Sequence, residues 1–149
     1  TTDSIVQSLH HNIYRAFDYR DESDIYDALE QSVSGDLLEN LYIDIRNGLR
    51  MREQGGAVSR VKSVEMLEAN REEAVDVPRG MEPWQVVDYV CRWNVEGVVE
   101  HWGHIHTQVN QYRARFTVAA LPESGWRITD LEILDESREK FQTGLRDFR

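Results

Sequence analysis

Three histidines, His101, His104 and His106, lie close together in the chain, and imidazole nitrogens are common ligands of zinc. His104 and His106 are two residues apart, so they share one face if this segment is a β-strand. If the flanking segments pair as a hairpin, His101 lies opposite His104 on that face. Three imidazoles on one side of a hairpin can hold zinc with an open coordination position. The alternative is that these histidines form local hydrogen bonds near a hairpin tip, in which case the chain needs no cofactor.

A row of polar side chains continues from His106 along the same face of the predicted strand. Gln108, Asn110 and Tyr112 follow at a spacing of two residues. Amide groups that lead toward an aromatic floor can line a ligand pocket. The alternative is a set of buried amides that bond to helix ends and water. The predicted pocket lining comprises Tyr14, His106, Gln108, Asn110, Tyr112 and Trp93.

Two other residue types with chemical potential fit structural roles better. Cys91 lies among apolar residues, which indicates a buried and inert thiol. His10 and His11 are adjacent in a predicted helix and point about 100° apart, so they cannot bind one metal together. Neither position adds to the predicted site.

Two alternating segments predict the hairpin that carries these side chains. With Trp102-Gly103 as the loop, each apolar residue of 87–93 meets an apolar partner, and a slip of one residue would place Arg and Thr opposite them. Trp-Gly is not a preferred pair for a tight hairpin turn, so we expect a bulge near the tip. The predicted pairs are Val87 with Val118, Tyr89 with Phe116, Cys91 with Ala114, and Trp93 with Tyr112.

The rest of the chain reads as helices first and strands afterwards. Apolar residues recur at helical spacing in 5–17, 25–33 and 36–53, with Asp21 or Ser23 as a cap of the second helix. A strand is expected over 58–67, a loop or poorly paired edge over 70–83, and a last strand over 126–133 with a bulge near Thr129-Asp130. Phe141, Leu145 and Phe148 have the spacing of a short amphipathic helix. We therefore expect a single α+β domain over 1–136 and an amphipathic tail over 137–149.

The composition limits the classes of partner. The 149 residues include 17 basic and 27 acidic side chains, a net charge of −10, which disfavours nucleic acids and anionic lipids. No apolar run reaches the roughly 18 residues of a membrane span, so direct membrane insertion is not expected. A lone cysteine forms no intrachain disulfide and fits a reducing compartment or a periplasmic domain without staples. The start at Thr1 fits a processed protein or a domain cut from a longer chain.

Two segments carry a family resemblance. The passage 14–21 (YRAFDYRD) leading into 25–29 (IYDAL), and the final segment 125–134 (GWRITDLEIL), resemble the first helices and the last strand of the nuclear transport factor 2-like superfamily. The resemblance implies a cone, in which three N-terminal helices pack on a curved antiparallel sheet around a pocket. The superfamily includes ketosteroid isomerases, scytalone dehydratases, polyketide cyclases, transport factors and domains without assigned activity, so fold alone does not give the function.

The resemblance also bears on catalysis. Tyr14 lies where the isomerases carry their oxyanion tyrosine, but neither of their catalytic carboxylates carries over to this sequence. The first hypothesis is therefore a non-catalytic binding or assembly module, such as a soluble, extracytoplasmic domain of a larger envelope or membrane protein. It would bind a protein partner, or self-associate through the sheet. The alternatives are an isomerase- or cyclase-type enzyme that acts on a small apolar ligand through Tyr14, and the histidine metal site.

Overall fold

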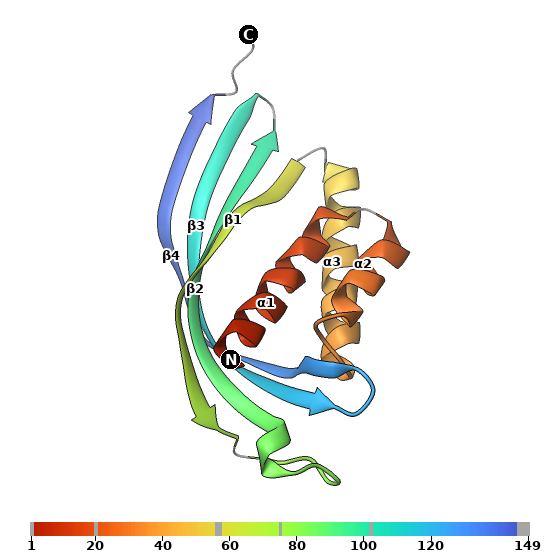
Figure 1. Cartoon of the computed structure of the whole chain (residues 1–149). Coiled ribbons are helices and arrows are strands. Elements are labelled where there is room, and N and C mark those ends of the chain that lie inside the picture. The colour runs from red at the N-terminus through yellow and green to blue at the C-terminus, as the bar shows by residue number, and fades with distance from the viewer. Residues whose placement is uncertain (1, 20, 56–57, 75, 102, 146–149) are drawn as a thin grey trace.

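The chain folds into three helices followed by a four-stranded antiparallel sheet, as the sequence predicts. The structure, a computed structural model, describes residues 2–19, 21–55, 58–74, 76–101 and 103–145. The sheet is open and curved, and the helices lie against its concave side (Figure 1). In chain order, the elements are α1 (Thr2–Arg15), η1 (Ala16–Asp18), α2 (Glu22–Glu30), α3 (Asp36–Gly55), β1 (Val58–Glu73), η2 (Pro83–Gln85), β2 (Val86–His101), β3 (His104–Leu121) and β4 (Gly125–Leu145).

Local sequence signals set the helix boundaries. Asp21 caps α2, because its carboxylate accepts hydrogen bonds from the Ser23 backbone N–H at 2.9 Å and from the Ser23 hydroxyl at 2.7 Å. Gly35 then adopts a φ of +72°, a conformation that favours glycine, and its carbonyl accepts a hydrogen bond from the Leu38 N–H as α3 begins. These signals separate α2 from α3 with a short connection.

The hairpin of β2 and β3 has the predicted register. Its pairing is continuous from Val86 opposite Ala119 to His101 opposite His104, and it includes all four predicted apolar pairs. The predicted bulge near the tip is therefore wrong. Gly103 has a φ of +79°, which supplies the left-handed conformation that a tight connection needs.

Bulges interrupt the pairing of both outer strands. The register shifts twice between β1 and β2 and three times between β3 and β4. Each shift leaves one residue of the outer strand without a direct partner, which bends that strand and increases its twist. The bulges therefore contribute to the curvature seen in Figure 1, and the predicted bulge near Thr129 is confirmed. The unpaired residues are Lys62 and Leu67 in β1, and Thr129, Leu134 and Glu139 in β4.

Two predicted boundaries need correction. Strand β1 continues to Glu73, beyond the predicted strand end. The predicted helical tail is wrong as far as Leu145, because 137–145 continue β4 and pair with β3. The tip half of β3 would otherwise leave one side of its backbone without hydrogen bonds. Residues 146–149, including Phe148, lie outside the described residues.

The core lies between the helices and the lower part of the concave face. Tyr89, Trp93 and Phe116 are buried there with Ile25 and Leu29 of α2. Fully burying one such apolar side chain stabilises a protein by about 1.5–3 kcal/mol. The end of α2 is also tied to β4, because the Ile128 N–H donates to the Ser32 carbonyl at 2.8 Å and the Ser34 N–H donates to the Ile128 carbonyl at 3.1 Å.

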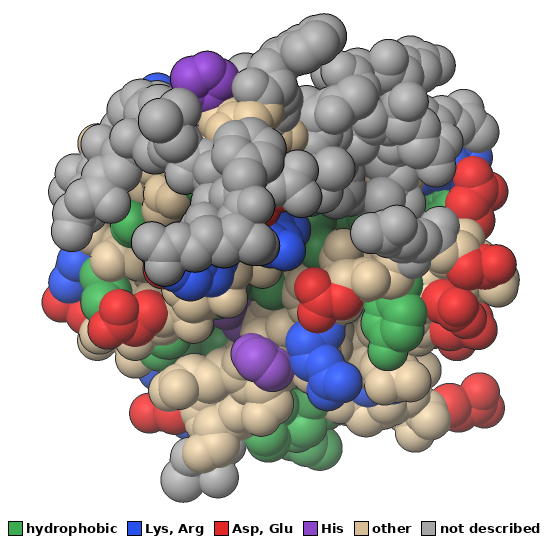
Figure 2. Space-filling view, turned by 90° about the horizontal axis from the view of Figure 1, so that it is seen from above, with side chains coloured by type: hydrophobic (Ala, Val, Ile, Leu, Met, Phe, Trp, Pro, Cys, Tyr) green, Lys and Arg blue, Asp and Glu red, His purple; other side chains and the backbone are tan. Residues whose placement is uncertain are grey.

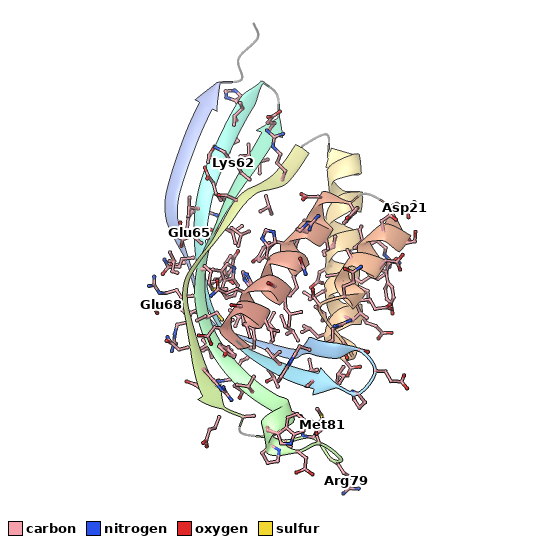
Figure 3. The ribbon with its side chains drawn as sticks, viewed as in Figure 1. Asp21, Lys62, Glu65, Glu68, Arg79 and Met81 are labelled. Atoms are coloured by element: carbon pink, nitrogen blue, oxygen red, sulfur yellow. The ribbon has the colours of Figure 1, made fainter. Side chains whose placement is uncertain are left out.

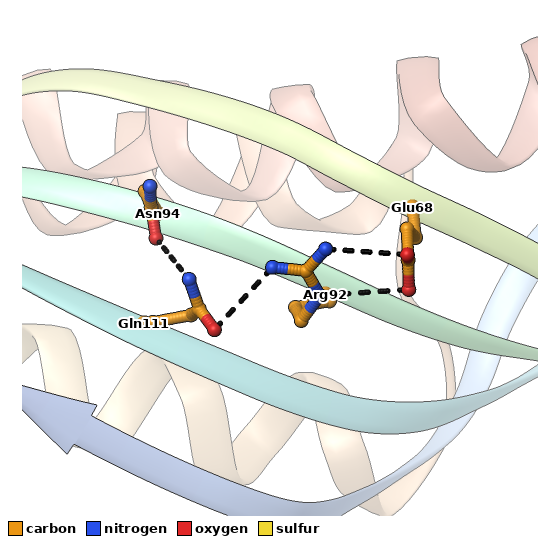
Figure 4. A network of polar contacts seen from close by, with 4 residues as sticks. All are labelled: Glu68, Arg92, Asn94 and Gln111. Atoms are coloured by element: carbon orange, nitrogen blue, oxygen red, sulfur yellow. Dashed lines mark hydrogen bonds and ion pairs between the residues drawn. The ribbon is translucent and has the colours of Figure 1, made fainter. Parts of the chain in front are cut away.

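The convex face of the sheet is charged. Glu65 and Glu68 lie on the side of the sheet away from the helices (Figure 3). The Glu68 carboxylate pairs with the Arg92 guanidinium at 3.2 Å, and Arg92 also donates to Gln111 at 3.4 Å (Figure 4). Surface ion pairs of this kind contribute at most about 1 kcal/mol each. No helix within the described residues is long and apolar enough to cross a membrane.

Candidate functional site

An aromatic cluster forms the floor of the concave face. The Trp93 ring stacks on Tyr112 at 5.6 Å and packs against Phe116 at 5.5 Å between ring centroids. From α1, His10 approaches Trp93 edge-on at 4.6 Å, and Tyr14 lies 5.2 Å from His10. The alternation of β2 and β3 and the helical spacing of α1 thus bring these five rings together.

His10 is a buried, neutral imidazole at the centre of this cluster. Its side chain is 3% exposed, and burial, with a smaller contribution from nearby His11, lowers its pKa from 6.5 to about 4. Its Nε2 atom is buried without a hydrogen-bond partner among the described atoms. The sequence placed His10 on a helix but gave no sign of this burial, because a histidine has no fixed preference for core or surface.

Tyr14 is held by a hydrogen bond to the aromatic floor. The Trp93 Nε1–H donates to the Tyr14 hydroxyl oxygen at 2.9 Å. Burial raises the pKa of Tyr14 to about 12, although this hydrogen bond lowers it. Tyr14 also lines a cavity of about 130 Å³ between the end of α1 and β1, next to His11, Asp18 and Val61. Among the described residues, Tyr14 and Asn110 therefore line different cavities.

A larger pocket lies beside the aromatic floor, on the paired strands β3 and β4. Its volume is about 390 Å³, and Asn110, Tyr112, Glu136, Ser137 and Arg138 line it. In the β-sheet register Tyr112 faces Glu136 and Asn110 faces Arg138, so these four side chains share the concave face. The pocket therefore combines an amide, a phenol, a carboxylate and a guanidinium within two neighbouring pairs of residues, and Ser137 lies between Glu136 and Arg138 on β4.

The electrostatics of the pocket keep its phenol protonated. Burial raises the pKa of Tyr112, the carboxylate of Glu136 raises it further, and a hydrogen bond from Asn110 lowers it in part. On the face of the molecule seen from above, acidic and basic side chains lie next to one another near the centre, and several acidic ones gather along one side (Figure 2). The pocket thus offers hydrogen-bond donors and acceptors with charges of both signs.

The sequence predicted part of this pocket and missed the rest. Asn110, Tyr112 and the supporting Trp93 were predicted, whereas Glu136, Ser137 and Arg138 were assigned to the boundary and the tail. The sequence could have indicated these three residues, because the backbone of the predicted β3 strand requires a hydrogen-bonded neighbour along its whole length. Gln108 lies further along β3 and is half-buried.

The histidine cluster is partly described. The rings of His104 and His106 lie 6.3 Å apart at an interplanar angle of 23° on the same face of β3. His101 lies opposite His104 in the backbone register, but its side chain is outside the described residues. Among the side chains that the structure describes, no group of three metal ligands is present. Zinc binding by the three histidines stays a prediction.

Cys91 is buried, as predicted. Burial, with a smaller contribution from Asp3, raises its pKa to about 12, so the thiolate that a nucleophile requires is not formed near neutral pH. No protein-family model and no curated protein matches the sequence.

Proposed function

We propose that this protein is a non-catalytic binding domain that holds a small, singly charged carboxylate in the pocket on the concave face of β3 and β4. The observation that carries the proposal is the pocket of about 390 Å³ with Asn110, Tyr112, Glu136, Ser137 and Arg138 around it. Its volume lies in the range of small-molecule sites. Its polar lining favours a polar ligand over the small apolar ligand expected from the cone.

Arg138 and Glu136 support the choice of ligand. A guanidinium matches a carboxylate in geometry and charge. Glu136 lies two residues away on the same face, so it repels an anion with two charges and attracts a hydrogen-bond donor. A small carboxylate that also carries an amino or hydroxyl group satisfies both side chains.

The aromatic floor supports binding rather than proton transfer. General acid–base catalysis is most efficient when the pKa of the catalytic group lies near the working pH. The pKa of His10 is lowered to about 4, and that of Tyr14 is raised to about 12. These two groups keep one protonation state near neutral pH, and both contact Trp93 in the aromatic floor.

The test is a comparison of ligand binding by two arginine variants. The purified protein is first screened by thermal shift against small carboxylates with and without amino or hydroxyl groups, and the hits are measured by isothermal titration calorimetry. A ligand at about 100 times its Kd stabilises the folded state by about 2.7 kcal/mol. Arg138→Gln should weaken binding at least about tenfold, the range for losing a charge-assisted pair.

Arg113→Gln is the matched control, because Arg113 is exposed on the convex face of β3 and its replacement changes the net charge equally. It should leave the affinity unchanged. Equal weakening by both variants, or no binding by any carboxylate in the set, would contradict the proposal.

We also propose that the domain belongs to the nuclear transport factor 2-like superfamily. The order of three helices before a curved antiparallel sheet, and the bulged last strand, support this assignment. A crystal structure in which the helices do not pack inside the curved sheet would contradict it.

A further inference from the structure

Trp84 is the most exposed large hydrophobic side chain among the described residues. Its exposed fraction is 72%, and Val77 in the same connection between β1 and β2 is 39% exposed. The connection projects from the lower end of the sheet, away from α1 to α3, where Arg79 and Met81 are labelled in Figure 3. An exposed tryptophan has a large apolar surface and a strong preference for interfaces.

The backbone around Trp84 is fixed by short-range hydrogen bonds. The Met81 N–H donates to the Pro78 carbonyl at 3.1 Å across a turn in which Gly80 has a φ of +89°. The Glu82 N–H donates to the Gln85 side chain at 2.8 Å, and the Gln85 N–H donates to the Glu82 carbonyl at 2.9 Å. Trp84 is therefore presented on an ordered backbone, which lowers the entropic cost of binding a partner.

The charges around Trp84 are mostly negative. The loop 76–85 contains Asp76 and Glu82 but one basic residue, Arg79, a sum of 1 − 2 = −1. The whole chain has a net charge of −10. This field repels a second copy of the chain and anionic lipids, and it attracts a basic partner.

We propose that the loop 76–85, called the Trp84 loop below, binds a Lys- and Arg-rich peptide segment of another protein. An arginine or lysine of that segment stacks over the indole face of Trp84, the aromatic ring with the strongest attraction for cations. Other basic side chains of the segment pair with Asp76 and Glu82. The interaction is independent of the pocket on the concave face of β3 and β4.

The test uses short fluorescent peptides and variants of the full chain. Basic peptides with arginine, basic peptides with lysine, and acidic peptides of equal length are titrated with the protein at two salt concentrations, with fluorescence anisotropy as the readout. The basic peptides should bind, more weakly at high salt, and the acidic ones should not. Trp84→Ala should weaken binding by about tenfold, whereas Trp84→Phe should keep part of the affinity.

Two double variants distinguish binding at the Trp84 loop from general electrostatic attraction to the acidic protein. Asp76→Asn with Glu82→Gln removes two exposed charges from the Trp84 loop, and Glu39→Gln with Asp44→Asn removes two exposed charges from α3. The first pair should lower the affinity several-fold more than the second. Circular dichroism should show the same Tm for the Trp84 variants and the parent, because an exposed side chain adds little to the core.

Three outcomes would overturn the proposal. In the first, Trp84→Ala binds the peptides as the parent does, or the two double variants weaken binding equally. In the second, Trp84 is required for binding to vesicles of zwitterionic lipid while the peptides do not bind. In the third, sedimentation equilibrium shows a dimer that Trp84→Ala abolishes.

Discussion

The two halves of the concave face use the same strands for opposite purposes. In the lower half, alternate positions of β2 and β3 carry Cys91, Trp93, Ala114 and Phe116, all buried against the helices. In the upper half, the alternation of β3 continues with Tyr112 and Asn110, which line a pocket together with residues of β4. The change from core to pocket lining thus coincides with a change of side-chain type at alternate positions of β3 and with the β4 bulge at Leu134.

Replacing Trp93 should have the largest effect on the lower half. Trp93→Ala removes a ring that is 3% exposed and stacks on Tyr112, so we expect a loss of about 3–5 kcal/mol in the free energy of unfolding. The measurement is urea denaturation monitored by circular dichroism. Asn110→Ala, in the upper half, should change the same quantity by about 0.5 kcal/mol or less. Similar losses in both variants would remove the distinction between the two halves.

Acid should destabilise the lower half through His10. The pKa of His10 is about 4 in the folded protein and 6.5 in the unfolded chain, so the unfolded state binds the proton more readily. The contribution of the neutral His10 side chain to the free energy of unfolding is fully present above pH 6.5. It is lost as the pH falls toward 4, by about 3 kcal/mol in total. The measurement is the free energy of unfolding at several pH values across this range.

The control for the acid effect is His10→Phe, which keeps a ring between Trp93 and Phe116 but cannot bind a proton. The difference between the parent and this variant isolates His10 from the carboxyl groups that titrate in the same range. A parallel pH dependence in the two proteins would show that His10 is not buried as described.

Within the lower half, a smaller effect than that of Trp93→Ala should come from removing the hydrogen bond that joins α1 to the floor. Tyr14→Phe leaves the Trp93 Nε1–H without its acceptor, and we expect a loss of about 1–2 kcal/mol. Chemical denaturation measures this change. The double variant with Trp93→Phe should recover part of the loss, since both partners are then apolar, and an absence of coupling in that cycle would argue against the bond.

Sequence patterns predicted the parts of the fold in which one signal dominates. The register of β2 and β3 followed from strict alternation, and the bulge at Thr129 from a change in apolar parity between Ile128 and Leu131. The bulge predicted at the hairpin tip was wrong, because the register continues without a shift to His101 opposite His104 and Gly103 adopts a positive φ in the connection. A residue pair that is uncommon in tight hairpin turns is therefore not sufficient evidence for a bulge.

The end of β4 shows why half of the candidate pocket was missed. Phe141 and Leu145 are four residues apart, a spacing that fits one face of a helix and one face of a strand equally well. The requirement that decides between the two is non-local, because β3 needs a partner for its backbone near the tip. Glu136 and Arg138 could have been placed in the pocket by extending the predicted ladder until β3 was fully paired.

The bulges of β1 and β4 bear on how copies of this protein behave at high concentration. Both strands lie at the borders of the sheet, where unpaired backbone groups can template the addition of a foreign strand and start aggregation. The interruptions at Lys62, Leu67, Thr129, Leu134 and Glu139 break the regular spacing that such templating needs. Edge-to-edge pairing of sheets from two molecules is therefore disfavoured, and we expect molecules to associate through their sheet faces and loops instead.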